Sequence, residues 1–195
     1  MLKNIFFIIL FLTFFPEIAY SHTYTGMNGF YDGLSHPVIG LDHFLAMVSV
    51  GIISAQLGGR SIWSIPSTFV VNMLIGGVLG IYLPVIDHKL IEYGIIVSVI
   101  LLGLGIAISK KLSALITMIF VVIFAFCHGI AHGLEIPNAS NPLYFALGFS
   151  TGTAILHLFG VGIGYYSVKT NLTSILLRVT GFIFSIYGVY LVFSI

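Results

Sequence analysis

Long apolar segments constrain the fold of this chain more than any other feature. Six of them are each long enough to cross a bilayer, which takes about 20 apolar residues in a helix. Their expected ranges are 37–57, 64–86, 89–109, 112–134, 142–167 and 172–194. The bilayer core offers the backbone no hydrogen-bond partners, and the segments do not alternate as barrel strands do. The sequence therefore predicts an all-α bundle of six transmembrane helices.

The charge content supports lipid as the surroundings of this bundle. Only 7% of the 195 residues are charged, whereas soluble domains carry about 25%. The breaks between the apolar segments are short, so we expect one membrane domain over residues 22–195. The net charge of +1 gives no reason to expect a nucleic-acid partner. No glycine-rich nucleotide motif is present, which argues against ATP-driven work by this chain alone.

The first 21 residues are typical of a signal peptide. Lys3 precedes a short apolar core from Ile5 to Phe15, and Ala19-Tyr20-Ser21 is a small-x-small cleavage site. An uncleaved anchor is the alternative. Cleavage after Ser21 would make His22 the new N-terminus, where its amine and imidazole could both bind a metal ion.

The basic residues agree with an N-terminus outside the membrane. That orientation places most of the lysines and arginines on the cytoplasmic side, as the positive-inside rule requires. These residues are Arg60, Lys110, Lys111, Lys169 and Arg178, and only Lys89 falls outside. The C-terminus is then also outside. We expect a multi-pass protein of a bacterial inner membrane.

Ionisable side chains gather in two short strings within the apolar segments. One string runs from His36 to His43 (HPVIGLDH) and the other from Cys127 to Glu135 (CHGIAHGLE). An ionisable side chain at membrane depth costs several kcal/mol, so such residues usually mark an ion pathway or a bound ion. A polar network without metal is the alternative.

Helical spacing indicates which of these side chains share a face. His36 and His43 are seven residues apart, so on a straight helix they share a face but lie about 10 Å apart along the axis. One ion could reach both only if the backbone near Gly40 is irregular. Asp42 points about 100° away from His43 on such a helix. It either faces a neighbouring helix or orients a ligand histidine.

The second string has the better spacing for one ion. His128 and His132 are four residues apart on one helix face, and Glu135 continues that face by one turn. His157 is expected near the middle of its segment. Imidazole and carboxylate donors favour nickel, zinc, cobalt or copper(II) over calcium and magnesium. The ion would be a substrate or a bound metal, and no permanent cofactor is expected.

Several other residues have simpler explanations. Asp32 could cap a turn, His88 lies in a charged loop, and Met47 could fill an apolar gap. Pairs of glycines four residues apart are typical of close helix packing, here within one bundle, with a homo-oligomer face as the alternative. These pairs are Gly76/Gly80, Gly148/Gly152 and Gly160/Gly164.

Three motifs resemble those of the HupE/UreJ family, membrane proteins associated with nickel hydrogenase and urease gene clusters. The first is His36-Pro37-Val38-Ile39-Gly40-Leu41-Asp42-His43, followed by Leu45-Ala46-Met47 and Val50-Gly51. The second is His128-Gly129-Ile130-Ala131-His132-Gly133-Leu134-Glu135. The third is Gly148-Phe149 with Gly152-Thr153, His157 and Gly160, where a small residue such as alanine is commoner at the position of Gly152.

The resemblance implies transport of nickel, or in some members of cobalt. Matched by position, the residues that would handle the metal are His36, Asp42, His43, His128, His132, Glu135 and His157. The preference for nickel over cobalt or zinc comes from the resemblance and not from the donor chemistry.

The sequence thus predicts a permease for a divalent transition-metal ion, passing it from periplasm to cytoplasm by facilitated diffusion or secondary transport. The alternative is an intramembrane metal-dependent hydrolase, in which three histidines and an acid hold zinc with one open position. Catalysis needs its ligands at one depth, whereas transport needs donors staggered along a path. A metal-sensing or assembly subunit would bind metal without flux.

Overall fold

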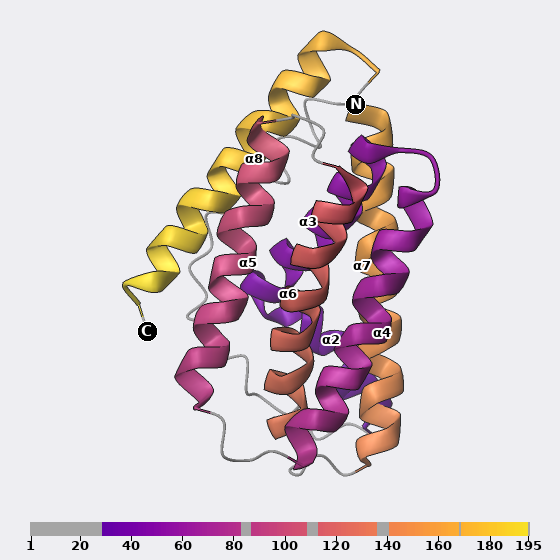
Figure 1. The fold of residues 1–195 in the computed structure, drawn as a ribbon, viewed down its shortest axis with the longest axis vertical. Helices are drawn as coiled ribbons and strands as arrows, with labels where there is room; N and C mark the ends of the chain where they lie inside the picture. The colour runs from indigo at the N-terminus through magenta and orange to yellow at the C-terminus, as the bar shows by residue number, and fades with distance from the viewer. Residues whose placement is uncertain (1–28, 83–86, 109–112, 136–140, 168, 195) are drawn as a thin grey trace.

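A computed structural model describes residues 29–82, 87–108, 113–135, 141–167 and 169–194 of the chain (Figure 1). These residues form seven helices and no strand, which confirms the predicted all-α class. The helices are α2 (Phe30–Ile39), α3 (Leu41–Leu57), α4 (Ser61–Tyr82), α5 (His88–Ile108), α6 (Ala114–Glu135), α7 (Pro142–Ser167) and α8 (Asn171–Val192). The predicted signal peptide and His22 lie outside the described residues.

Five of the helices are long and apolar enough to cross a membrane by themselves, and the bent pair of α2 and α3 makes up to six. Their bounds lie close to the predicted segments, and α7 has the same bounds as its prediction. Large apolar side chains are exposed along the outside of the bundle, for example Val78 on α4, Ile155 on α7 and Phe182 on α8. This apolar outer surface fits a bilayer, and the protein is a multi-pass membrane protein.

The first span is bent, which the sequence analysis did not predict. A single straight helix over 37–57, with Pro37 in its first turn, is wrong. Instead Pro37 lies inside α2, and Gly40 has an extended backbone (φ −73°, ψ 108°) between two helices that are bent by 83°. Pro37 lacks a backbone donor only toward the turn before it, whereas the chain changes direction at Gly40. The extended backbone there ends α2 and lets α3 start in a new direction, so the apolar run is continuous in sequence but not in direction.

The bent pair continues across the bundle instead of turning back. α2 packs on the first half of α7, where a Cβ built on Gly152 would lie 3.0 Å from the ring of Pro37. α3 packs on the second half, where a Cβ on Gly160 would lie 3.1 Å from the Cα of Gly51. Both contacts advance in the same direction along α7, so α2 and α3 together form one broken span.

Glycines hold the helices together within the bundle, as the sequence predicted. A Cβ added to Gly76 or Gly80 of α4 would lie 3.2 Å and 3.0 Å from the Cα atoms of Gly129 and Gly133 on α6. Contacts this close are tighter than ordinary packing allows, so only glycine lets the two backbones meet. The pairs on α7 face α2 and α3 in the same way.

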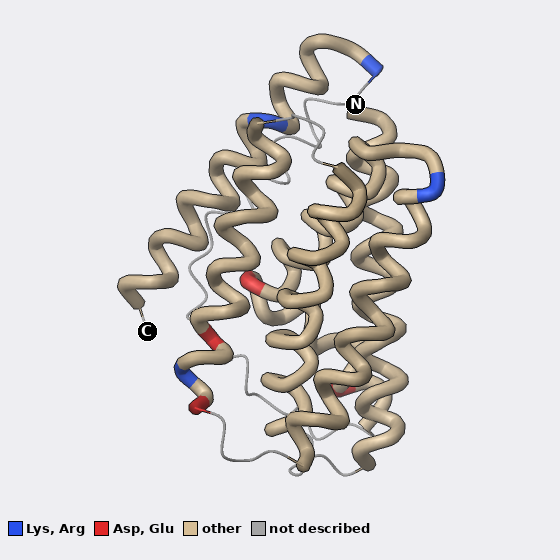
Figure 2. Tube along the Cα trace, in the orientation of Figure 1, with Lys and Arg blue, Asp and Glu red and all other residues tan. Residues whose placement is uncertain are grey.

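The two ends of the bundle differ in charge. Figure 2 shows most of the described basic residues at the end where α7 finishes and α8 starts. There Lys169 lies over the rings of Tyr165 and Tyr166, 4.6 Å and 4.4 Å from their centroids. Lys89 lies at the start of α5, at the opposite end. The predicted orientation was based on this distribution of basic residues. It places the outer side of the membrane at the end of the bundle where α6 finishes and α7 starts. That orientation stays a prediction.

Candidate metal site

The bend at Gly40 brings the two histidines of the first motif together. The ring centroids of His36 and His43 lie 5.9 Å apart, edge to face. A straight helix would separate them by about 10 Å along its axis. The irregular backbone near Gly40, on which a shared ion depends, is therefore present. His36 is half-buried in the last turn of α2, and His43 is buried in the first turn of α3.

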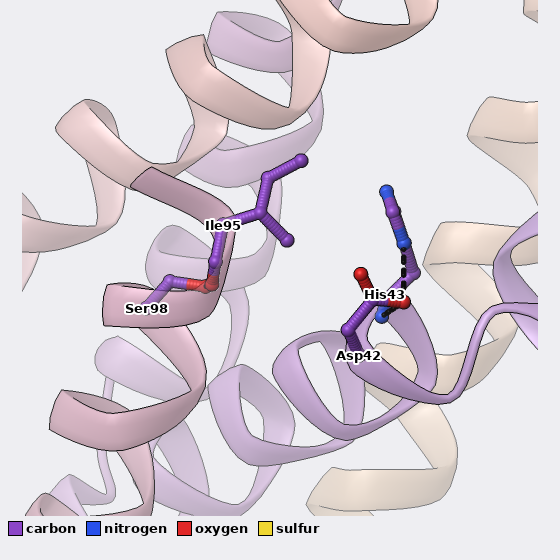
Figure 3. Close-up of polar contacts among 4 residues, drawn as sticks. All are labelled: Asp42, His43, Ile95 and Ser98. Carbon is purple, nitrogen blue, oxygen red and sulfur yellow. Dashed lines mark hydrogen bonds and ion pairs between the residues drawn. The ribbon is translucent and has the colours of Figure 1, made fainter. Parts of the chain in front are cut away.

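Asp42 is buried and orients His43. Its Oδ1 accepts hydrogen bonds from the backbone N–H of His43 and from His43 Nδ1, both at 2.8 Å (Figure 3). Ser98 of α5, drawn nearby, donates its own hydroxyl to the carbonyl of Ile95. A carboxylate on Nδ1 fixes the ring and its tautomer, so Nε2 is the nitrogen through which His43 would bind a metal.

Gly40 leaves room for this pair. A Cβ at position 40 would lie 3.1 Å from both Asp42 Oδ1 and His43 Nδ1. Both atoms would have to move by a few tenths of an ångström to admit it, which would disturb the hydrogen bond between them. The glycine of the first motif therefore leaves the orientation of His43 undisturbed.

Helix α6 supplies two further imidazoles from one face, as its spacing predicted. The ring of His132 lies 4.7 Å from that of His36 and 4.8 Å from that of His43, between centroids. The ring of His128 lies 5.2 Å from that of His43. His36, His43, His128 and His132 thus form one cluster from three helices, which we call the four-histidine cluster. His43 is the member that touches the other three.

His128 is prepared for a ligand at its second nitrogen. Its Nδ1–H donates to the carbonyl of Phe124, 2.8 Å away. Its Nε2 is buried and has no hydrogen-bond partner among the residues that the structure describes. A buried polar atom without a partner costs about 1–3 kcal/mol. A metal-binding histidine has this arrangement, with one nitrogen bonded to a carbonyl and the other available to the ion.

The glycines of the second motif lie on a neighbouring face of α6, about 100° around the helix from the histidines. A Cβ on Gly129 would lie 2.8 Å from the backbone nitrogen of Gly77, and one on Gly133 would lie 2.9 Å from the Cα of Gly80. Each histidine of the motif is followed by a glycine that packs on α4. The motif therefore fixes the position of α6 on one face and presents imidazoles on the neighbouring one.

His157 is buried deeper along α7 and does not touch the four-histidine cluster through any ring contact among the described residues. Phe69 of α4 contacts both, 5.5 Å from His128 and 5.1 Å from His157 between ring centroids. The sequence analysis missed Phe69. It also missed Phe149, whose ring lies 4.0 Å from that of His132. Nothing in the sequence distinguishes these two from the other phenylalanines of a chain with 17 of them.

The remaining candidates lie at other positions along the chain. His88 is exposed at the start of α5, Asp32 is half-buried in the first turn of α2, and Met47 is fully buried in the core. Glu135 is the last residue of α6, and its side chain lies outside the described part of the structure.

The imidazole rings of the cluster pack against one another, and their nitrogens do not surround a common centre. Within the described ranges, no group of three His, Cys, Asp or Glu side chains is placed to hold a metal ion without movement. Binding therefore needs rotations that turn ring nitrogens toward a common centre. The donor set itself fits nickel, cobalt or zinc, which imidazole nitrogens bind well.

Comparison with known proteins shows the family of the chain. The sequence model of the HupE / UreJ protein family matches residues 10–191. The chain belongs to the HupE/UreJ family. Protein HupE of Rhizobium leguminosarum bv. viciae is 43% identical over 148 residues, which are 76% of this chain and 76% of that protein. No solved structure matches the chain.

The three strings that resemble HupE/UreJ motifs are the ones that build this site. The first supplies His36, Asp42 and His43, the second supplies His128 and His132, and the third supplies His157. All of them lie inside the range that matches the HupE/UreJ family. The motifs are far apart in sequence and meet in the bundle because α2 and α3 pack along α7, while the ring of His132 on α6 contacts His36, His43 and Phe149.

Proposed function

We propose that this HupE/UreJ protein is a permease for a divalent transition-metal ion, with nickel as the expected substrate and cobalt as the next. The ion would pass from periplasm to cytoplasm across a bacterial inner membrane, by facilitated diffusion or secondary transport. Nickel is chosen because the family resemblance implies it, while the donor chemistry supports the wider class of borderline ions.

One observation carries this proposal: four histidines form a continuous series that enters the bundle, and a fifth lies deeper along α7. The rings touch in the order His36, His132, His43 and His128. His132 and His128 lie three and seven residues before the end of α6, so they are about 5 and 10 Å deep along that helix. His157 lies 15 residues into α7, at a depth of about 22 Å.

Staggered donors suit transport better than catalysis. Each site on a conduction path must bind strongly enough to replace water and weakly enough to release the ion to the next site. Neighbouring imidazoles 5.2 Å or less apart along the series allow the ion to change ligands one at a time. A hydrolase would instead gather its ligands around one ion and leave an open position, and the spread from His36 to His157 does not favour that arrangement.

Flux measurements with the purified full chain in proteoliposomes test the proposal. We expect saturable influx of radioactive Ni²⁺ above that of protein-free liposomes, competition by Co²⁺, and no competition by Mg²⁺. An imposed pH gradient then distinguishes facilitated diffusion from proton-coupled transport. Metal binding without any flux, or turnover of lipid or peptide, would reject the permease in favour of a sensing subunit or a hydrolase.

Asp42→Asn tests how the carboxylate acts on His43. The amide can still accept one hydrogen bond, but it removes the charge that favours a metal-bound imidazole. Loss of such an outer partner costs roughly 10–100-fold in metal affinity, so we expect the half-saturating Ni²⁺ concentration for uptake to rise by about that factor. Asp87→Asn, at an exposed carboxylate before α5, is the matched control. Unchanged affinity in Asp42→Asn would contradict the orienting role.

A further inference from the structure

A single phenyl ring contacts both the four-histidine cluster and the deeper histidine. Phe69 is fully buried on α4, with a relative exposure of 0%. Its ring meets those of His128 and His157 at steep angles of 64° and 85°, at centroid distances of 5.5 Å and 5.1 Å. Within the cluster, by contrast, each imidazole touches the next directly. The series of donors is therefore interrupted at one point, and the interruption is apolar.

We propose that Phe69 is the gate of the permeation path, which it closes between His128 and His157 and opens by moving its ring. The inference rests on the proposed permease function and adds the residue that controls passage. An apolar constriction stops ions because it excludes the water or donor atoms that would solvate them. While the ring stays in place, an ion held by His128 has no ligand to replace its lost contacts on the way to His157.

His157 has the properties of a receiving site beyond the gate. It is 1% exposed, and neither of its ring nitrogens has a hydrogen-bond partner among the described residues. The hydroxyl of Thr153, one turn earlier on α7, is directed instead to the sulfur of Met73, 3.8 Å away. Native proteins rarely leave both nitrogens of a buried imidazole unsatisfied, because a buried polar atom without a partner has lost its hydrogen bonds to water. An ion that has passed Phe69 would supply the missing partner.

The backbone next to Phe69 is suited to a movement of this ring. Pro66 lies inside α4, three residues before Phe69. Because proline has no N–H, α4 lacks the hydrogen bond that would join residue 66 to the carbonyl of Ile62, one turn before the turn that carries Phe69. Sharp bends in helices concentrate at prolines of this kind. α4 is therefore less constrained one turn before the gate than in the turns that pack Gly76 and Gly80 on α6.

Substitution of Phe69 tests the gate in proteoliposomes that hold the full-length protein. Phe69→Leu and Phe69→Ala are compared with Phe184→Leu, a buried phenylalanine of α8 for which no ring contact with a histidine is found among the described residues. The probes are radioactive Ni²⁺ and Mg²⁺, together with Ni²⁺ binding to the purified protein. We expect both Phe69 variants to admit Ni²⁺ several-fold faster and to admit Mg²⁺, which the unaltered protein excludes. Ni²⁺ binding should stay unchanged, because the four-histidine cluster is intact.

Each outcome decides the inference. Phe69 would only fill space if both Phe69 variants admitted Ni²⁺ at the rate of the unaltered protein and still excluded Mg²⁺. Loss of flux in the Phe69 variants and in Phe184→Leu alike would show a packing role and would equally overturn the gate. Phe69→Leu decides alone should Phe69→Ala fail to fold. A lack of Ni²⁺ flux through the unaltered protein would instead reject the permease function itself, so the two failures are distinguishable.

Discussion

Replacement of His43 by alanine is expected to reduce Ni²⁺ influx to the level of protein-free liposomes. His43 is the one member of the four-histidine cluster whose ring touches the other three, at 5.9 Å, 5.2 Å and 4.8 Å from His36, His128 and His132. Its removal leaves a gap in the middle of the series, which an ion would have to cross without a ligand. The initial rate of radioactive Ni²⁺ uptake is the measurement.

The comparison needs a matched control, because loss of flux could also come from loss of fold. His88→Ala makes the same chemical change at an exposed histidine at the start of α5, and it should keep the uptake rate of the unaltered protein. His43→Asn keeps a polar side chain beside Asp42 and should lose uptake like the alanine variant. Size-exclusion profiles in detergent show that each variant is folded. Normal uptake by folded His43→Ala would remove the central residue from the path.

The helices could be predicted from the sequence because the bilayer allows so few structures. Backbone groups without water must be paired within each segment, so length and polarity nearly determine where a span begins and ends. α7 shows this well, since polar breaks bound it on both sides. The close packing at Gly76 and Gly80 was predictable for a similar reason, because small residues at that spacing have few other uses in a membrane helix.

The bend at Gly40 was not predictable from the same signals. A glycine inside an apolar run is compatible with a straight helix, and this chain has 22 glycines. Which of them breaks a helix depends on what packs around it, here the fit of α2 and α3 along α7. The helical spacing of His36 and His43 was therefore applied to a helix that does not exist. The spacing of His128 and His132 was reliable because α6 is continuous.

Phe69 illustrates a different limit. Its contact with both His128 and His157 depends on how α4, α6 and α7 are placed relative to one another, which no local pattern describes. Ionisable residues in a membrane stand out because their burial is costly. A phenylalanine in the same place is indistinguishable from packing, so an apolar gate is visible only once the helices are assembled.

A methyl group on Gly160 should destabilise the bundle, because it would meet backbone atoms of α3. The added Cβ of Gly160→Ala would meet the carbonyl oxygen of Val48 and would lie 3.1 Å from the Cα of Gly51. Both neighbours are backbone atoms of α3, so no side-chain rotation relieves the contact and the two helices must separate. Overpacking of this kind costs about 1–3 kcal/mol, and we expect the upper part of that range. Thermal unfolding in mild detergent measures the loss.

Gly162 provides the control two residues further along the same helix. A Cβ at Gly162 has nothing within 4 Å, so Gly162→Ala should change the free energy of unfolding by no more than about 0.5 kcal/mol. Because α3 carries His43 and α7 carries His157, separation of these helices by Gly160→Ala should also slow Ni²⁺ uptake, while Gly162→Ala should not. Equal stabilities for the two variants would mean that α3 and α7 are not in backbone contact at Gly160.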